Sequence, residues 1–245
     1  MQKEKYDIIV IGAGSGGLGV SIFMAKIGLK ILLIDKDDEN IGGDCLNYGC
    51  VPSKALIHVS RILQQAKEAE KFGYSISGKP DMQRAIAYVH SKQDIIRKHE
   101  NAAYLRKEGL DVVLGLAYFH SPDSIVVNDK IYSAKRIVLA TGSRPVSLKV
   151  PGIENVTQFN NESVFDMASL PKRMLIIGGG PIGIEIGQAL SRLGSKIAII
   201  DRGAYILPHD EHAVTSILRE RLQKEGIEFL MQSSIDSFPS ATRAL

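Results

Sequence analysis

The chain has 245 residues, of which 44% are hydrophobic and 23% are charged, and its 30 basic and 27 acidic residues give a formal net charge of +3. This composition is typical of a soluble globular protein with one large or two ordinary domains. The charge is small and evenly spread, which excludes a nucleic-acid-binding footprint. No apolar run approaches the roughly 20 residues of a membrane span. We therefore expect a cytoplasmic protein with neither a membrane nor a nucleic-acid partner.

The first pattern in the chain is a strand, a glycine turn, a helix and a second strand. Residues 7–11 (DIIVI) predict the first strand, 12–17 (GAGSGG) the turn, and ILLID, which ends at Asp35, the second strand. The length, about 30 residues, is that of a βαβ mononucleotide-binding unit. A signal peptide is the alternative for this end because lysines precede the apolar run, but glycines interrupt the run and no cleavage site follows.

The same order of elements returns later in the chain. Residues 174–177 (MLII) predict a strand, 178–183 (GGGPIG) a glycine turn, and KIAIID, which ends at Asp201, a second strand after an intervening helix. In each copy the acidic residue follows the glycines by 18 to 23 positions. A plain glycine turn in a parallel sheet is the alternative, but it does not require the acid in both copies.

Each residue type in this pattern has a physical reason. The first glycine makes a tight turn, the second lets the backbone approach a pyrophosphate, and the third allows the helix to pack on the strand. The helix N-terminus offers N–H groups to the phosphates, and the acid accepts hydrogen bonds from a ribose. We therefore expect two dinucleotide sites, made by Gly12, Gly14, Gly17 and Asp35 in the first copy and by Gly178, Gly180, Gly183 and Asp201 in the second.

Two dinucleotide sites in one chain suggest two different dinucleotides and electron transfer between them. Asp201 favours a ribose with a free 2′-hydroxyl, and therefore NADH. Arg202 beside it leaves NADPH open.

Between the two copies, the periodicity predicts two amphipathic helices and then a group of strands. The helices are expected at 51–72 and 82–109, separated by the turn-rich GYSISGKPD. The stretch 112–142 is rich in β-branched residues and predicts strands that return to the first sheet. A domain boundary is expected within 145–171, where prolines and polar residues are frequent.

Both cysteines of the chain lie in the segment GGDCLNYGCVPSKAL, residues 42–56. Positions 45 and 50 lie about 140° apart in a regular helix, so at least one cysteine is expected outside it. Pro52 suits a first helical turn, which places Cys50 at or just before a helix N-terminus, where a thiolate is stabilised. Cys45 in the preceding loop can then form a strained, reducible disulfide with Cys50. Two buried free cysteines, or zinc with His58, are the alternatives.

GGDCLNYGCVPSKAL resembles the active-site segment of the flavoprotein disulfide reductases, the family of dihydrolipoamide dehydrogenase, glutathione reductase and mercuric reductase. The similarity continues through GAGSGG, ATGSRP (140–145) and GGGPIGIEIG (178–187) and so covers nearly the whole chain. VPSK and GGGPIG look closer to the dihydrolipoamide dehydrogenase and mercuric reductase branch. The resemblance implies an α/β fold with two Rossmann-like βαβ dinucleotide-binding domains, the second inserted in the first and truncated. The implied domains are an FAD-binding domain at 1–150, which carries the redox-active disulfide helix, and an incomplete NAD(P)-binding domain at 151–245.

The resemblance also implies a reaction and a role for each site residue. NAD(P)H reduces FAD, FAD reduces the Cys45–Cys50 disulfide, and the dithiol reduces a disulfide or metal-ion substrate. Cys45 resembles the interchange thiol and Cys50 the charge-transfer thiolate, while Lys54 and Glu185 resemble the lysine beside the flavin and its glutamate partner. The expected FAD-binding residues are Gly12, Gly14, Gly17, Asp35, Lys36, Gly43, Thr141 and Gly142. The expected nicotinamide-nucleotide residues are Gly178, Gly180, Gly183 and Asp201, and no resident metal is expected.

Two features depart from the family pattern. Asp44 stands where the family usually has threonine, and its carboxylate is expected to raise the pKa of the cysteines by like-charge repulsion. Family members are also nearly twice as long, with a C-terminal dimerisation domain that supplies a His-Glu acid/base pair. We therefore expect the N-terminal half of a homodimeric disulfide reductase. The alternative is a truncated FAD- and nucleotide-binding fragment without turnover, and the substrate stays open.

Overall fold

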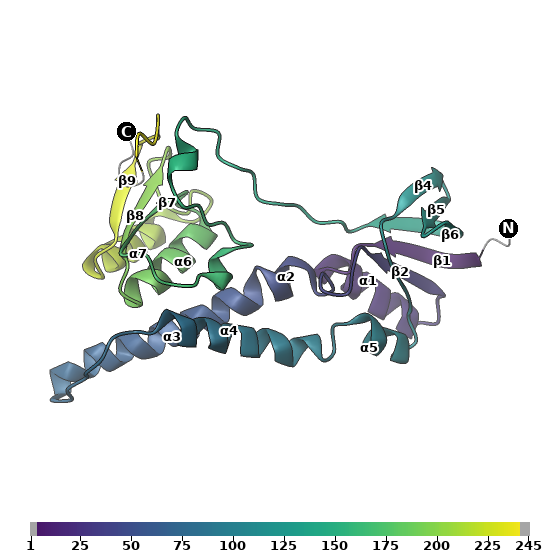
Figure 1. Cartoon of the computed structure of the whole chain (residues 1–245), viewed down its shortest axis with the longest axis horizontal. Coiled ribbons are helices and arrows are strands. Elements are labelled where there is room, and N and C mark those ends of the chain that lie inside the picture. The colour runs from purple at the N-terminus through teal and green to yellow at the C-terminus, as the bar shows by residue number, and fades with distance from the viewer. Residues whose placement is uncertain (1–3, 241–245) are drawn as a thin grey trace. The chain divides into compact units, whose positions relative to one another are not determined.

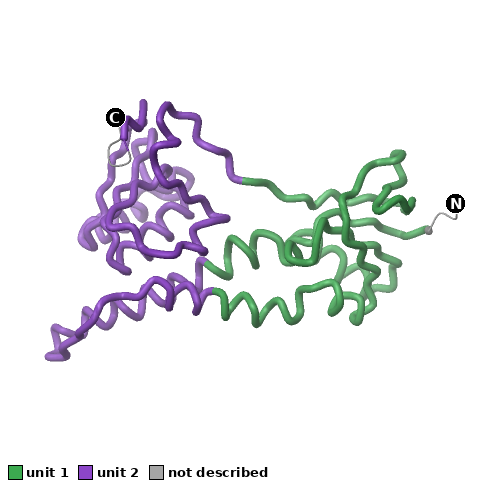
Figure 2. Tube along the Cα trace, viewed as in Figure 1, with its two compact units in different colours: residues 1–52, 90–144 green, residues 53–89, 145–245 purple. Residues whose placement is uncertain are grey.

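The computed structural model describes residues 4–240, and the chain divides into two compact units (Figure 1; Figure 2). Unit 1 comprises Met1–Pro52 and His90–Arg144, and unit 2 comprises Ser53–Val89 and Pro145–Leu245. The helices α3 (Cys50–Glu68) and α4 (Met82–Arg97) each contribute residues to both units.

Unit 1 is built on a six-stranded sheet with the strand order β3-β2-β1-β6-β5-β4. Its strands are β1 (Glu4–Ile11), β2 (Ile31–Asp35), β3 (Asp111–Leu114), β4 (Tyr118–Ser121), β5 (Ser124–Val127) and β6 (Lys130–Leu139). Its short helices are α1 (Ser15–Lys26), α2 (Gly43–Asn47) and α5 (Ala102–Lys107). The pairs β1–β2, β1–β6 and β2–β3 are parallel, and β4–β5 and β5–β6 are antiparallel. The expected return of the later strands to the first sheet is therefore confirmed.

The strands of this sheet place alternate residues in two separate cores, because successive side chains of a strand point to opposite faces. Val10 packs with Leu18 of α1 and Leu105 of α5. Its neighbour Ile9 packs with Tyr132 on the other side. The first four residues of β2 are all buried, as expected for a parallel strand covered on both faces.

Unit 2 contains a parallel three-stranded sheet, β7-β8-β9, and the helical pair formed by α3 and α4. Its other elements are η1 (Ala69–Phe72), η2 (Ile153–Asn155), η3 (Val164–Asp166), β7 (Arg173–Ile177), α6 (Pro181–Arg192), β8 (Lys196–Asp201), α7 (His212–Lys224) and β9 (Glu228–Met231). One hydrophobic core joins Leu56 and Val89 of the helical pair to Leu190 of α6 and Ile199 of β8. The predicted α/β fold with two βαβ units is thus confirmed.

The helix expected at 82–109 is wrong in one respect, because it is interrupted. The chain forms α4, ends it at Arg97, and restarts as α5 at Ala102. Asn101 caps α5 by accepting a hydrogen bond from the Tyr104 N–H at 2.8 Å, and its own amide donates to the Arg97 carbonyl at 2.7 Å. A capping residue in this position offers the backbone an alternative to a continuous helix.

A buried ion pair connects α6 to the end of α7 in unit 2. Arg192 donates two hydrogen bonds to Glu225, at 2.8 and 2.9 Å, and the side chains are only 14% and 7% exposed. Burial raises the pKa of Glu225, but the hydrogen bonds from Arg192, Arg221 and Gln188 lower it by a larger amount. The net shift of the pKa is therefore downward. The carboxylate therefore stays charged and depends on its partner.

Arg192→Met should destabilise the protein because it removes the most buried partner of the Glu225 carboxylate and leaves that charge with only the exposed Arg221 and the neutral Gln188 amide. We expect the free energy of unfolding to fall by about 3 kcal/mol in chemical denaturation. Lys135→Met is the matched control, since Lys135 pairs with Asp7 at 2.7 Å but is 78% exposed, and its loss should cost less than about 1 kcal/mol. Equal effects of the two substitutions would contradict the assigned role of the buried pair.

Candidate functional site

The glycine turn of unit 1 follows β1 directly, and the chain itself requires two of its glycines. Gly12 has φ +103°, and a Cβ built there would lie 2.2 Å from the Ala140 carbonyl oxygen. A Cβ on Gly17 would lie 1.7 Å from the Gly12 carbonyl oxygen. Any side chain at either position would collide with backbone, so these two glycines fix the close packing of β1, β6 and α1.

Asp35, the last residue of β2, connects the glycine turn to the strand end. Its carboxylate accepts hydrogen bonds from the Ala13 N–H at 2.6 Å and the Lys36 N–H at 2.7 Å. Each carboxylate oxygen keeps a further lone pair, because an ionised carboxylate can accept about four hydrogen bonds. Asp35 therefore both holds the turn and can accept a bond from a ribose hydroxyl.

The N-terminus of α1 is open toward a ligand. Its N-cap residue is Gly14, which provides no side-chain cap, so the first N–H groups of the helix lack acceptors within it. A Cβ on Gly16 would meet nothing within 4 Å, and one on Gly14 would only touch the Cα of Gly43 at 3.5 Å. The unfilled space and the free N–H groups fit a phosphate group.

Unit 2 repeats this arrangement at the start of α6. Asp201 accepts hydrogen bonds from the Gly179 and Gly203 N–H groups, each at 2.7 Å, and these bonds lower the pKa of its carboxyl. A Cβ on Gly183 would lie 2.2 Å from the Gly178 carbonyl oxygen, so Gly183 is required by the chain. Gly180 is different, because it has φ −78° and a Cβ there would meet nothing.

The helix that carries Cys45 starts against the glycine turn of unit 1. Gly42, at φ +93°, donates from its N–H to the Ala13 carbonyl at 2.9 Å. A Cβ on Gly43 would lie 2.5 Å from the Cα of Gly14, so two glycine backbones are in close contact. The expectation that Cys45 lies in a loop is therefore wrong. It lies in α2, and the turn of α1 and the cysteine segment are neighbours.

Cys45 and Cys50 are brought together across the junction between two helices. Cys50 is the first residue of α3, and the two cysteines are present as thiols rather than as a disulfide, with Cys45 half-buried and Cys50 exposed. Gly49 permits the sharp reversal, since a Cβ on it would lie 2.8 Å from the Asp44 carbonyl oxygen. The pair can therefore interact even though one regular helix would separate them.

The environment of Cys45 sets its reactivity. Its pKa is raised, first by the hydrogen bond between its side chain and that of Cys50, and then by burial and by repulsion from Cys50, while a hydrogen bond with the Ser15 hydroxyl opposes the shift. The raised pKa thus has its cause in Cys50, and the effect expected from Asp44 is not among these causes. Asp44 is exposed at the start of α2.

Cys50→Ser should lower the pKa of Cys45, because the substitution removes the thiol that hydrogen-bonds it and repels its charge. The thiolate fraction of Cys45 at pH 7 should then rise, since a lower pKa means more ionised thiol at a fixed pH. We expect alkylation of Cys45 by iodoacetamide to become several-fold faster at that pH. Slower alkylation of Cys45 at pH 7 in the variant would show that Cys50 does not raise the pKa of Cys45.

Lys54 and Glu185 form an ion pair within unit 2. The Lys54 Nζ lies 2.5 Å from the Glu185 Oε2, and the side chains are 60% and 40% exposed. The pair joins α3 to α6 across 131 residues of sequence. An exposed ion pair adds little to stability, so a contribution to folding does not explain why these two residues are paired.

The remaining predicted residues of the first dinucleotide site also lie at the carboxyl ends of the unit 1 strands. Thr141 and Gly142 follow β6, which pairs with β1 up to Ile11 and Leu139, and Gly142 has φ +71°. Lys36 follows β2 and donates its N–H to Asp35. Ligands of open α/β sheets bind outside the carboxyl ends of the strands.

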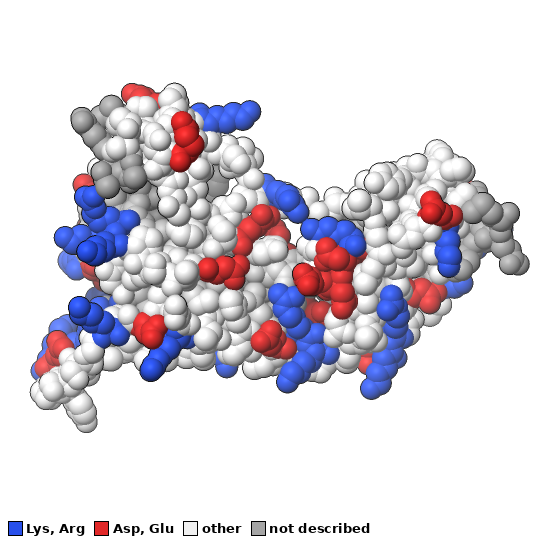
Figure 3. Space-filling model, viewed as in Figure 1, with Lys and Arg blue, Asp and Glu red and all other residues white. Residues whose placement is uncertain are grey.

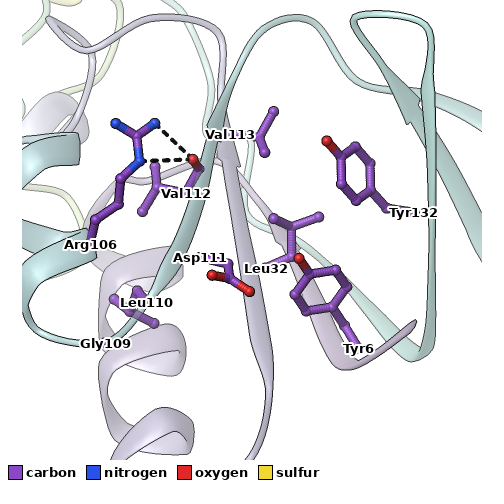
Figure 4. A pocket seen from close by; sticks show the side chains of 9 residues that line it. All are labelled: Tyr6, Leu32, Arg106, Gly109, Leu110, Asp111, Val112, Val113 and Tyr132. Carbon is purple, nitrogen blue, oxygen red and sulfur yellow. Dashed lines mark hydrogen bonds between the residues drawn. The ribbon is translucent and has the colours of Figure 1, made fainter. Parts of the chain in front are cut away.

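A pocket of about 460 Å³ lies at the opposite edge of the same sheet (Figure 4). Tyr6, Leu32 and Asp111 line it, and each lies near the amino end of its strand. Arg106 borders it but donates two hydrogen bonds to the Val112 carbonyl, at 3.2 and 2.8 Å. None of the predicted site residues lines this pocket, so it is separate from the candidate site.

Within residues 4–240, no group of three or more His, Cys, Asp or Glu side chains is arranged to hold a metal ion. In the same part of the chain, no helix has both the length and the apolar character that crossing a membrane requires. The face shown in Figure 3 carries basic and acidic side chains interspersed.

The family model described as pyridine nucleotide-disulphide oxidoreductase matches residues 6–243. The chain belongs to this family. Dihydrolipoyl dehydrogenase of Thermus scotoductus is 36% identical over 228 residues, which are 92% of this chain and 48% of that protein. Dihydrolipoyl dehydrogenase of Acholeplasma laidlawii is 32% identical over 241 residues, which are 96% of this chain and 70% of that protein.

Solved structures agree with this membership. The HOCl-induced flavoprotein disulfide reductase RclA from Escherichia coli matches with a TM-score of 0.80 and 25% identity, over 95% of this chain and 50% of that chain. The chain thus spans about half the length of RclA and of the Thermus relative.

Two residues near the cysteines were missed by the sequence reasoning. Ser15 lies within the glycine turn, and its hydroxyl reaches Cys45 only because α2 starts on that turn. Gln93 is a buried amide on the apolar face of α4 that also carries Val89. Gln93 had a signal in the sequence, because a polar side chain on a buried helix face needs a partner. Ser15 had none, since the contact depends on packing distant in sequence.

Proposed function

We propose that this chain is the electron-entry part of an FAD-dependent pyridine nucleotide-disulfide oxidoreductase. Electrons pass from NAD(P)H through FAD to the Cys45–Cys50 disulfide and on to a disulfide or metal-ion substrate. The observation that supports this most strongly is the packing of Gly43 on Gly14, which places the cysteine helix directly beside an open helix N-terminus suited to a dinucleotide. The family membership supports the same reaction class.

We assign FAD to unit 1. The first-turn N–H groups after Gly14 bind its pyrophosphate, and Asp35 accepts from its ribose, because both groups keep unused hydrogen-bonding capacity. Lys36, Gly43, Thr141 and Gly142 complete the site at the ends of β2 and β6. When bound, FAD supplies a two-electron relay between the nicotinamide and the disulfide.

We assign the nicotinamide dinucleotide to unit 2, with NADH favoured. Gly180 leaves space at the N-terminus of α6 that the protein does not fill. Asp201 is an ionised acceptor because its pKa is lowered, which suits a ribose 2′-hydroxyl and disfavours a 2′-phosphate.

The chemistry at the cysteines follows from their contacts. The Cys45 thiolate attacks a substrate disulfide, and one substrate sulfur leaves as a thiolate that takes up a proton. Cys50 then attacks the sulfur of Cys45, the second substrate sulfur leaves as a thiol, and the Cys45–Cys50 disulfide closes. Ser15 stabilises the Cys45 thiolate by hydrogen bonding. We propose that Lys54 and its partner Glu185 take the roles of the corresponding ion pair in the resembled family.

Three finer points belong to the same proposal. In this proposal the FAD-binding domain extends over residues 1–150 and the NAD(P)-binding domain over 151–245, although residues 53–89 and 145–150 of the first range belong to unit 2. The complete enzyme is a homodimer, by analogy with the dimerisation domain of the resembled family. Its location is the cytoplasm, where a close cysteine pair more often serves redox chemistry than structure.

An anaerobic titration with NADH tests the proposal. The purified chain, loaded with FAD, should develop a long-wavelength charge-transfer band from the Cys50 thiolate when one equivalent of NADH is added, because the two electrons end on the disulfide and the flavin returns to its oxidised form. Two alkylatable thiols should appear per chain. A flavin spectrum that NADH leaves unchanged, with no new thiols, would contradict the proposal for this chain and favour a binding fragment without turnover.

A further inference from the structure

The side chain of Gln93 holds the end of the helix that carries Cys45. Gln93 is 6% exposed, and its Nε2 donates to the carbonyl oxygens of Leu46 and Asn47, both at 3.0 Å. These are the last two residues of α2, and they lie more than 40 positions away from Gln93 in the sequence. One buried amide therefore uses both of its N–H groups on one helix end.

The helix α2 needs such a partner more than an ordinary helix does. It has only five residues, so few backbone hydrogen bonds stabilise it internally. The carbonyl groups of its last turn find no N–H donor within the helix. Leu46 and Asn47, which carry two of them, are buried. Without Gln93, two buried carbonyls would lose their donor, and α2 would lose the contact that defines where it ends.

The position of α2 controls whether the two sulfurs meet. Cys45 directly precedes Leu46, and the chain reverses at Gly49 to reach Cys50. The cysteine segment is thus held at its start by the contact of Gly43 with Gly14 and at its end by Gln93. A disulfide requires Cα atoms about 4.4 to 6.8 Å apart, so a displaced helix end reduces the chance that the thiols react with each other.

We propose that Gln93 is a positioning residue for the Cys45–Cys50 pair, and that its two hydrogen bonds to the end of α2 favour the disulfide over the dithiol. This inference rests on the proposed redox function of the pair. Gln93 acts through the backbone of α2 and contacts neither sulfur in any hydrogen bond described for it.

A second polar contact from α4 provides a matched control. Arg97 lies one turn after Gln93 and donates to the Glu39 carbonyl at 3.3 Å. Arg97 therefore also connects α4 to unit 1, but its contact lies at Glu39, before α2 begins. Arg97→Met removes a side chain of similar reach without touching α2.

The test is the equilibrium of each chain with glutathione. The dithiol reacts with one oxidised glutathione to give the Cys45–Cys50 disulfide and two reduced glutathione molecules, which receive the two electrons and two protons. Trypsin cleaves after Lys36 and Lys54, so one peptide contains both cysteines, and after alkylation its mass reports the oxidised fraction. We expect Gln93→Met to lower the equilibrium constant about tenfold, or about 30 mV, and Arg97→Met to change it less than about twofold.

Each outcome has a distinct meaning. A wild-type chain that forms no internal disulfide at any glutathione ratio contradicts the proposed function. A normal wild-type disulfide with an unchanged or larger constant in Gln93→Met overturns only the role of Gln93, and so does an equal decrease in Arg97→Met. If Gln93→Met does not fold, nuclear magnetic resonance of the wild type decides. The Gln93 side-chain amide should shift between the dithiol and disulfide states, and an unshifted signal overturns the inference.

Discussion

Cys45→Ser should convert a chain that closes an internal disulfide into one that accumulates a mixed disulfide with glutathione at Cys50. In the wild type, a glutathione attached to Cys50 is expelled when the neighbouring Cys45 attacks, because the two side chains are hydrogen-bonded to each other. A serine hydroxyl does not perform this attack. Cys50 is exposed, so glutathione reaches it in both chains.

The expected result is an all-or-none difference in intact mass after incubation with oxidised glutathione. The wild type should show the loss of two hydrogens and almost no adduct, whereas Cys45→Ser should show one glutathione per chain. NADH-dependent disulfide reduction should fall by at least about a thousandfold, or about 4 kcal/mol of transition-state stabilisation. Stable glutathione adducts on the wild type would show that the thiols do not react with each other.

Gly183→Val should mainly reduce stability and Gly180→Val should mainly reduce nucleotide binding, although the two residues lie only three positions apart. A Cβ at position 183 would collide with the Gly178 carbonyl oxygen at 2.2 Å, whereas a Cβ at position 180 would meet no protein atom within 4 Å. Gly183→Val should therefore lower the free energy of unfolding by about 3 kcal/mol or more. Gly180→Val should change it by less than about 1 kcal/mol.

Nucleotide binding should be lost in Gly180→Val, the variant that keeps its stability. Valine at position 180 fills the space that we assign to the pyrophosphate, so we expect NADH affinity to fall by about a hundredfold in calorimetry while the fold is retained. The unfolding measurement serves as the control, because it shows that the binding loss does not come from unfolding. Wild-type affinity in Gly180→Val would place the nucleotide elsewhere.

The two βαβ units could be predicted because their signals are local. The glycines of each turn and the acid that closes the second strand lie within one unit of about 30 residues. In the structure Asp35 and Asp201 do the same work, since each accepts from an N–H inside its own glycine turn. The sequence therefore contained both the pattern and most of the reason for it.

The junction at the cysteines could be predicted only in part. Pro52 correctly indicated a helix that starts near Cys50. The helix α2 has no periodic signal, because it has five residues and begins with a glycine. Its existence depends on Gly14, which lies far away in the sequence. The break between α4 and α5 was missed for a related reason, since the cap made by Asn101 competes with a continuous amphipathic pattern.

The central claim is that Cys45 and Cys50 interconvert between dithiol and disulfide, and peptide mapping of the wild-type chain tests it most directly. The chain is oxidised with oxidised glutathione, alkylated and cleaved with trypsin. The mass of the peptide from Asp37 to Lys54 is then measured. The account predicts a peptide that lacks two hydrogens and carries no alkyl group, and that gains two alkyl groups after treatment with a dithiol. A peptide that carries two alkyl groups, or glutathione, before that treatment would contradict it.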